Sequence, residues 1–381
     1  MFKSPNRKLK FGLLGAGVAA AVTAAFVLPS VASPATHTDH HAAPAAAAPT
    51  FKLTPQGRKL FAEYHANKTT KHSTGTGRIS PDATSGGHTG SFSGDGRQAL
   101  LARNPSTGVL RLYQGTGKLQ GTSTFGNPKD PSQGPVNIMG GVGPSVFPWI
   151  YQGDFNGDGY ADVVGIGKNR QIDIALNQGN GVAGYKTLDN GTVVGTLDSS
   201  FDYAFIFDAN GDGKADIIAR KYGTGVWYAL VGTGNIASGE AFEQPKPILL
   251  EQKLVNNKPV PVTDDAFAAM DDFTGDGVPD MIFERSNGEL HLWDFYGGGT
   301  DDNGKPVGKD FLIGRGWNIF NAIDIGDVNS DGAPDLIARK SASGDLVVYP
   351  HTGQWNTDNP PATWSAPVVI GHGWNVYDII S

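Results

Sequence analysis

Short apolar segments separated by polar turns dominate the chain from about Thr84 to its end. The segments are four or five residues long, and Gly, Asn, Asp and Pro stand between them, as around 203–207, 216–220, 226–230 and 247–250. Such segments, bounded by these turn residues, are typical of β-strands. Helices would need longer segments with a 3.6-residue period, which the many Gly and Asp residues interrupt. The pattern therefore predicts an all-β fold for residues 84–381.

A group of four predicted strands recurs along the chain. Equivalent segments near the C-terminus are 335–339, 346–349 and 367–370, and an Asp-Gly pair marks each group at intervals of 54 to 64 residues. Four strands in a repeating unit of this length are typical of β-propeller blades. The Asp-Gly pairs predict five blades, with six or seven as the alternatives.

The C-terminal segment repeats the stretch that precedes the last complete unit. Residues 370–377 read I-G-H-G-W-N-V-Y, and residues 313–320 read I-G-R-G-W-N-I-F. The chain therefore ends just after the first strand of a further unit, whereas the first unit lacks a good strand before Asp95. We expect the C-terminal strand to complete that first blade, which would close the ring and leave few exposed strand edges.

A nine-residue polar motif, D-x-N-x-D-G-x-x-D, connects the first two strands of four units. Oxygen-bearing side chains at positions 1, 3, 5 and 9, with a Gly at position 6 that permits a tight turn, can surround Ca²⁺ with oxygen ligands. One copy could be an ordinary turn, but four copies at fixed spacing favour calcium. The third copy has Thr instead of Asn. The candidate ligands are Asp154, Asn156, Asp158, Asp162, Asp208, Asn210, Asp212, Asp216, Asp272, Thr274, Asp276, Asp280, Asp327, Asn329, Asp331 and Asp335.

These loops differ from the EF-hand, which needs a Glu at position 12 and a helix on each side. Position 12 is occupied by Gly165, Ala219, Phe283 and Ala338, and strand-like residues follow position 9 in each copy. We therefore predict about four calcium loops inside β-hairpins. A degenerate fifth copy at 91–99 keeps Asp95 but has Ser at positions 1 and 3 and Ala at position 9, so no metal is expected there.

The N-terminus predicts export from the cell. Residues 1–10 carry four basic residues and no acid, an apolar segment spans 11–28, and small residues precede a cleavage point after Ala32. This is the pattern of a secretory signal peptide over residues 1–32; an uncleaved anchor is the alternative, at the short limit for a membrane span. After cleavage we expect a secreted monomer without a membrane span. Residues 33–83 are expected to be an Ala/Pro/His/Thr-rich linker with a short helix at about 55–66.

Composition narrows the possible partners and the means of stabilisation. The chain has no cysteine, so disulfides cannot hold the fold and the predicted calcium loops are the remaining candidate. Its 37 acidic residues outnumber its 30 basic ones, and four of the basic residues belong to the predicted signal peptide. No basic face is evident, which excludes a nucleic-acid-binding protein.

The four loops, and the pattern Asp-Leu-Ile-Ala-Arg…Gly-Asp-Leu-Val-Val-Tyr at 335–349, resemble the FG-GAP/VCBS-type repeats of secreted bacterial β-propellers. The calcium loops of that family are similar to those of integrin α-subunits. The resemblance covers about residues 84–381 and matches the family's calcium ligands in the four loops, although its regular Phe-Gly and Gly-Ala-Pro signatures are missing. It implies a module used in lectins, adhesins, receptors and accessory domains of enzymes, and no particular activity.

The sequence favours binding over catalysis, and we assign no catalytic residue and no organic cofactor. It contains no G-x-S-x-G, no H-E-x-x-H, no Walker loop and no thiol. Asp264-Asp265 and Asp301-Asp302 could cleave glycosides as carboxylate pairs, but solvated loops are the more ordinary reading. His291 and His351 are expected to be satisfied polar residues rather than bases.

The seven Trp residues could stack on sugars or pack between blades. We expect packing for Trp317 and Trp374, and leave both readings open for Trp355. The sequence thus predicts a calcium-binding extracellular module for carbohydrate binding or cell adhesion, with a glycan or a surface protein as partner. The alternatives are a polysaccharide hydrolase or lyase on the same scaffold, and a purely structural surface protein.

Overall fold

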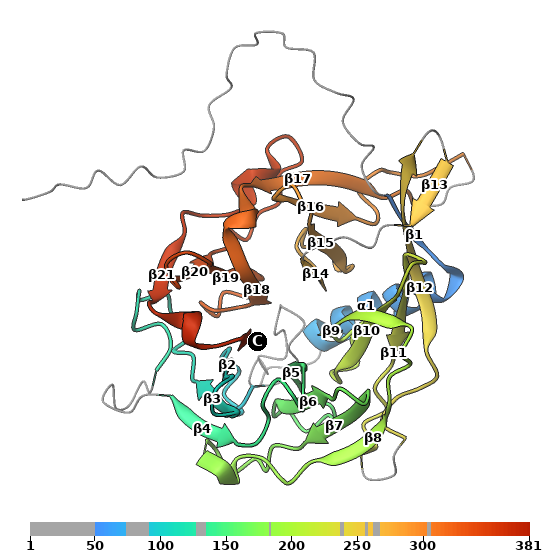
Figure 1. Cartoon of the computed structure of the whole chain (residues 1–381). Helices are drawn as coiled ribbons and strands as arrows, with labels where there is room; N and C mark the ends of the chain where they lie inside the picture. Colours follow the sequence, from blue (N-terminus) through green and yellow to red (C-terminus); the bar gives the residue numbers. More distant parts are fainter. Residues whose placement is uncertain are drawn as a thin grey trace, which may run out of the picture. The chain divides into compact units, whose positions relative to one another are not determined.

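The computed structural model describes residues 50–73, 91–126, 135–182, 184–236, 240–255, 258–261, 267–302 and 306–381. All of these residues belong to one compact unit, 46–381. Within this unit five antiparallel sheets are arranged in a ring, which is a five-bladed β-propeller (Figure 1). The predicted all-β fold and the predicted number of blades are confirmed.

Each blade has four strands, which are ordered below from the innermost outward. Blade 1 consists of β22 (Ile379–Ile380), β2 (Leu100–Asn104), β3 (Val109–Tyr113) and β4 (Val136–Met139). Blade 2 consists of β5 (Trp149–Gly153), β6 (Asp162–Ile166), β7 (Gln171–Ala175) and β8 (Thr192–Thr196). Blade 3 consists of β9 (Phe201–Phe207), β10 (Asp216–Lys221), β11 (Val226–Leu230) and β12 (Lys246–Val255).

The last two blades follow the same order. Blade 4 consists of β14 (Phe267–Asp271), β15 (Asp280–Glu284), β16 (Glu289–Asp294) and β17 (Lys309–Arg315). Blade 5 consists of β18 (Phe320–Gly326), β19 (Asp335–Lys340), β20 (Leu346–Tyr349) and β21 (Val368–Gly371). Short 3₁₀ helices lie between strands: η1 (Gly184–Lys186), η3 (Trp317–Ile319), η4 (Pro360–Thr363) and η5 (Trp374–Val376).

The core lies between neighbouring blades rather than within one sheet. The second strand of each blade is covered on both faces, so all residues of β6 and β15 are buried. This explains why those segments are continuously apolar in the sequence, whereas β3 alternates between buried and half-buried positions. Trp317 and Trp374 are 5 % and 6 % exposed and pack against Tyr349 and Tyr113, respectively. The expected core role of these two Trp residues is confirmed.

The C-terminal strand closes the ring, as expected. Ile379 and Ile380 of β22 pair with Arg103 and Ala102 of β2. The amide of Leu101 donates to the carbonyl oxygen of Ser381 at 2.7 Å, and the amide of Ser381 donates back at 3.0 Å. The first and last repeats therefore share one sheet (Figure 1).

The N-terminal part of the described chain packs on blades 3 and 4. Strand β1 (Thr50–Leu53) pairs with β12, which also pairs with β13 (Lys258–Pro261). Helix α1 extends over Pro55–Ser73, beyond the expected range of 55–66. Thr54 caps it, since the Gly57 amide donates to Thr54 Oγ1 at 3.0 Å. In the described part of the chain no helix is long and apolar enough to cross a membrane.

Candidate functional site

Each of the four predicted calcium loops connects the innermost strand of a blade to its second strand. They join β5 to β6, β9 to β10, β14 to β15 and β18 to β19. Because the blades repeat one strand order around the ring, the loops occupy equivalent places. The structure therefore keeps the sixteen predicted residues in four groups of four, one group per loop.

The aspartate at position 1 organises each loop by accepting backbone amides. Asp154 accepts the amides of Gly157 at 2.6 Å and Gly159 at 2.7 Å. The same two glycines have φ angles of 79° and 88°, which explains the preference for Gly at positions 4 and 6. Asp208, Asp272 and Asp327 accept the position-6 amide at 2.8, 3.0 and 2.9 Å.

The aspartate at position 9 is buried and connects its loop to the blade. Asp162 accepts the Phe155 amide at 3.0 Å through one oxygen and the Asn177 amide, just past β7, at 2.8 Å through the other. Asp216 and Asp335 bind the corresponding amides in their blades. In the third loop Asp280 accepts the amide of Thr274 at 2.9 Å.

Burial makes ionisation of these carboxyls unfavourable in the absence of a cation. It raises the pKa of Asp162 to about 8 and that of Asp335 to about 7. It also raises the pKa of Asp216 and Asp280 well above the ordinary value, and neighbouring aspartates of the same loops add to the effect. At position 1, burial raises the pKa of Asp154, Asp272 and Asp327.

The donor set of the loops fits a hard cation such as Ca²⁺. Positions 1, 3 and 5 each carry a carboxylate, amide or hydroxyl oxygen, and a carboxylate oxygen that accepts one amide keeps a further lone pair. In the third loop Thr274 Oγ1 is buried without a hydrogen-bond partner. Among the described residues no three acidic or histidine side chains already converge as a metal cluster. The position-9 aspartates stay predicted ligands, and their oxygens accept backbone amides in this structure.

The second loop differs because it holds a cation of its own chain. Lys214 occupies position 7 of this loop, and its ammonium lies 2.6 Å from the Asp212 carboxylate. In the loops at 154–162 and 327–335, position 7 is Tyr or Ala, and the position-3 Asn donates to the position-5 carboxylate at 2.9 and 2.8 Å. Calcium would compete with Lys214 in one loop and not in these two.

Helix α1 contacts two of the loops, which the sequence pattern did not predict. Asn67 Nδ2 donates to the carbonyl oxygen of Asn210 at 2.8 Å, and His65 Nδ1 lies 3.2 Å from the carbonyl oxygen of Gly277. Tyr64 is buried and stacks on Phe207. An amphipathic pattern over 60–64 was the available signal, but its partner surface lies in blades 3 and 4.

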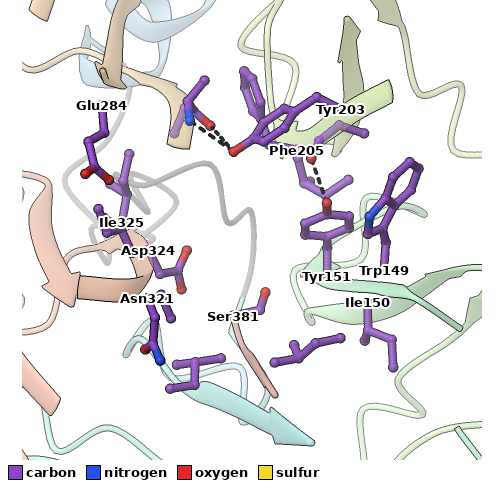
Figure 2. Close-up of a pocket in the computed structure, with 18 of the residues that line it drawn as sticks. Trp149, Ile150, Tyr151, Tyr203, Phe205, Glu284, Asn321, Asp324, Ile325 and Ser381 are labelled. Carbon is purple, nitrogen blue, oxygen red and sulfur yellow. Dashed lines mark hydrogen bonds between the residues drawn. The ribbon is translucent and has the colours of Figure 1, made fainter. Parts of the chain in front are cut away.

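A cavity of about 540 Å³ lies at the centre of the ring. The innermost strands β5, β9, β14, β18 and β22 contribute residues to its wall. Figure 2 shows Trp149, Tyr151 and Tyr203 on one side and Glu284, Asp324 and Asn321 on the other. The tyrosine hydroxyls link adjacent strands, because Tyr151 donates to the Ala204 carbonyl at 2.6 Å and Tyr203 accepts the Ala268 amide at 3.0 Å.

A second, smaller cavity of about 330 Å³ lies between blades 1 and 2. Its wall includes Asp173, Asp189 and Tyr185, and the Tyr185 side chain is 60 % exposed. Burial raises the pKa of Asp173, and Asp189 raises it further.

The other candidates from the sequence have structural surroundings or lie outside the described residues. His291 Nδ1 is 2.9 Å from Asp310, and His351 Nε2 is 3.0 Å from the carbonyl oxygen of Phe273; both rings are buried. Asp301 and Asp302 are exposed. Trp355 is half-buried against Phe311. Asp264, Asp265, the predicted signal peptide and most of the predicted linker lie outside the described residues.

Comparison with known proteins supports the repeat assignment. Residues 154–219 and 272–338 match the FG-GAP-like repeat family, and each match contains two of the four predicted calcium loops. No curated protein matches the sequence. One similar solved structure is a lectin from Agrocybe aegerita, described as recognising non-reducing terminal N-acetylglucosamine. It has 15 % sequence identity and a TM-score of 0.36, and the match covers 73 % of this chain and 80 % of that chain.

Proposed function

Because the chain is a five-bladed propeller built from FG-GAP-like repeats, we propose that it is a secreted, calcium-stabilised binding module for extracellular glycans or surface proteins. The observation that carries the proposal is the recurrence of one oxygen-donor loop at the same junction of four blades. Since the chain has no cysteine, these loops rather than disulfides are its candidate for a repeated cross-link.

Calcium would be held by the side chains at positions 1, 3 and 5 of each loop, with position 9 behind them. The ion would supply two positive charges to carboxylates that are otherwise buried beside one another. In each loop the position-9 aspartate also bonds inside its own blade, so ion binding would stabilise the junction of the first two strands. Extracellular calcium modules bind at about 10⁻⁴–10⁻³ M, which suits a protein outside the cell.

The binding role is supported by the surface that the scaffold leaves available. Two cavities, one central and one between blades, are lined by both aromatic rings and carboxylates. Aromatic faces and polar groups together are the usual means of holding sugars. Weak sites on a rigid ring also gain from multivalency when the partner repeats.

The test is a pull-down of residues 33–381 on a panel of insoluble polysaccharides and on glycan arrays, with calcium or with EGTA. We expect retention by at least one glycan with calcium and its loss with EGTA. Equal retention with calcium and with EGTA would show that glycan binding does not depend on calcium. Silence on every glycan and surface protein tested, from a protein that does bind calcium, would contradict the binding role.

A further inference from the structure

One position on the second strand of each blade faces the start of the innermost strand. In register these residues are Arg103, Ile166, Arg220, Glu284 and Arg339, opposite Ile379, Trp149, Tyr203, Phe267 and Ala322. Three blades thus place an arginine there, one places an isoleucine, and blade 4 places a glutamate. Of these five residues, Glu284 is the one whose side chain lines the central cavity.

Each of the three arginines binds an oxygen of its own blade. Arg103 makes two bonds to the Asp378 carboxylate, at 2.9 and 2.6 Å, and Arg220 makes two bonds to Asp202, at 3.2 and 3.3 Å. Arg339 Nε donates to Asn321 Oδ1 at 2.7 Å. The Asp378 and Asp202 carboxylates, which line the cavity, are therefore neutralised within the protein.

Glu284 stands in blade 4 at the position that three other blades fill with an arginine. Its side chain is 5 % exposed and contributes to the cavity wall, and among the described residues its carboxylate has no hydrogen-bond or ion-pair partner. The neighbouring Arg285 is directed to Asp310, at 2.9 Å. By sequence offset, the residue that corresponds to Asp202, Asn321 and Asp378 in blade 4 is Ala266, which has no polar side chain.

The rest of the wall leaves this negative charge uncompensated. None of the described residues that line the cavity is Lys, Arg or His, and Asp324 adds a further carboxylate on the same side as Glu284 (Figure 2). Ala268 and Ala269 of β14 also line the cavity. The opposite side offers the rings of Trp149 and Tyr151.

We propose that the central cavity is a binding site for a primary ammonium group carried by a small hydroxylated molecule, such as an amino-sugar residue. The Glu284 carboxylate accepts the ammonium hydrogen bonds, while the side-chain amide of Asn321 and Asp324 are placed for hydroxyls. The apolar face of the sugar ring lies against the aromatic side. A volume of about 540 Å³ is within the usual range for small-molecule sites, about 300–1,000 Å³. This inference builds on the proposed binding function and adds the chemistry of one ligand.

The experiment is isothermal titration calorimetry with residues 33–381 in calcium-containing buffer. The probes are glucosamine, N-acetylglucosamine, glucose and Nα-acetyl-lysine, which separate the ammonium from the sugar ring and an amino sugar from a lysine side chain. Glu284→Gln keeps the shape and removes the charge. Glu243→Gln, at a surface pair with Lys246, is the matched control.

We expect glucosamine to bind and N-acetylglucosamine and glucose to bind at least tenfold more weakly. Glu284→Gln should reduce glucosamine affinity tenfold or more, because the ammonium loses its ion pair and keeps only a hydrogen bond to a neutral oxygen, and Glu243→Gln should leave it unchanged. Stronger binding of Nα-acetyl-lysine than of glucosamine would support the ammonium site and show that its ligand is a lysine side chain rather than an amino sugar. Equal binding of glucosamine and N-acetylglucosamine, or glucosamine binding unchanged by Glu284→Gln, would overturn the inference. Calcium-dependent glycan retention without any ammonium binding would overturn it while leaving the proposed function intact.

Discussion

At the scale of single residues, the fold depends on carboxylates that are placed where their charge is costly. The position-9 aspartates are 0–1 % exposed and use both oxygens, or one in the third loop, to accept backbone amides. Glu284 is buried without such donors. Backbone amides and, as we propose, calcium compensate the negative charge of the position-9 aspartates. A bound ligand would compensate the charge of Glu284.

Asp331→Ala tests the calcium role of one loop that lacks a competing lysine. We expect the variant to bind one fewer calcium ion per chain and to have a lower Tm in calcium. Its free energy of unfolding in calcium should fall by about 1–3 kcal/mol, depending on the ratio of free calcium to Kd. In EGTA the variant should melt at nearly the wild-type temperature, because one repelling carboxylate has gone. Differential scanning calorimetry with and without calcium measures both values. Asp358→Ala, an exposed loop carboxylate, is the control, and an equal calcium shift in both variants would contradict the assignment.

Glu284→Gln also predicts a pH-dependent change in stability. Burial raises the pKa of Glu284 above its ordinary value of 4.5, so the folded chain holds this proton more tightly than the unfolded chain. The group's contribution to stability is then greatest below pH 4.5 and falls as the pH rises through the folded pKa. Without added amine, the variant should melt near the wild-type temperature at pH 4 and above it at pH 7, by about 2 °C. A variant less stable than wild type at pH 7 would show that Glu284 has a stabilising partner.

At the scale of the elements, the connections between blades matter more than the strands themselves. Arg103 joins β2 to Asp378 before β22 and also donates to the carbonyl oxygens of Val142 and Phe147, which lead into blade 2. Arg339 likewise donates to the carbonyl oxygens of Trp374 and Tyr377, which lead into blade 1. One buried side chain thus fixes its own blade and the next one.

Arg103→Met should be strongly destabilising. It leaves the Asp378 carboxylate and two carbonyl oxygens without their donor, and breaking a buried pair in this way costs about 3–5 kcal/mol, or somewhat less for this pair because Asp378 is 30 % exposed. Urea denaturation gives the change in unfolding free energy. The control is Arg315→Met. The Arg315 side chain is 69 % exposed and pairs with Glu289, so its loss should lower the free energy of unfolding by under about 1 kcal/mol. Similar losses in both variants would contradict the special role of Arg103.

Sequence patterns predicted the strands and loops but not the long-range partners. The second strands could be recognised because burial on both faces makes them continuously apolar, and the loops because a fixed spacing of Asp, Asn and Gly recurs. The roles of Arg103, Arg220 and Arg339 were not predicted, since their partners lie in other segments. Helix α1 was predicted too short, and Asn67, just beyond its predicted end, bonds to the carbonyl oxygen of Asn210, a partner that lies far away in sequence. Glu284 became noticeable only when the register aligned it with the arginines.

At the scale of the whole molecule, one sheet made from both ends of the propeller holds the ring closed. β22 supplies the innermost strand of blade 1, and Trp374 and Tyr377 pack against Tyr113. A propeller opened at this point would expose the edge of β2 and the apolar faces of two blades.

Deletion of residues 374–381 should therefore abolish most of the cooperativity of unfolding. We expect a broad transition at a markedly lower temperature in calorimetry, because blade 1 loses its innermost strand and Arg103 loses Asp378. A milder variant, Trp374→Phe, keeps the strand and should lower the Tm by a few degrees only. A truncated chain with an unchanged sharp transition would contradict closure by β22.

The most direct measurement of the central claim is the calcium content and the calcium-dependent melting of residues 33–381. Native mass spectrometry in calcium should show about four bound ions per chain, and EGTA should remove them and lower the Tm by several degrees, with recovery when calcium is restored. Magnesium at the same concentration should restore less, because it prefers a rigid octahedral shell. A chain that carries no calcium and melts at the same temperature in EGTA would contradict the account.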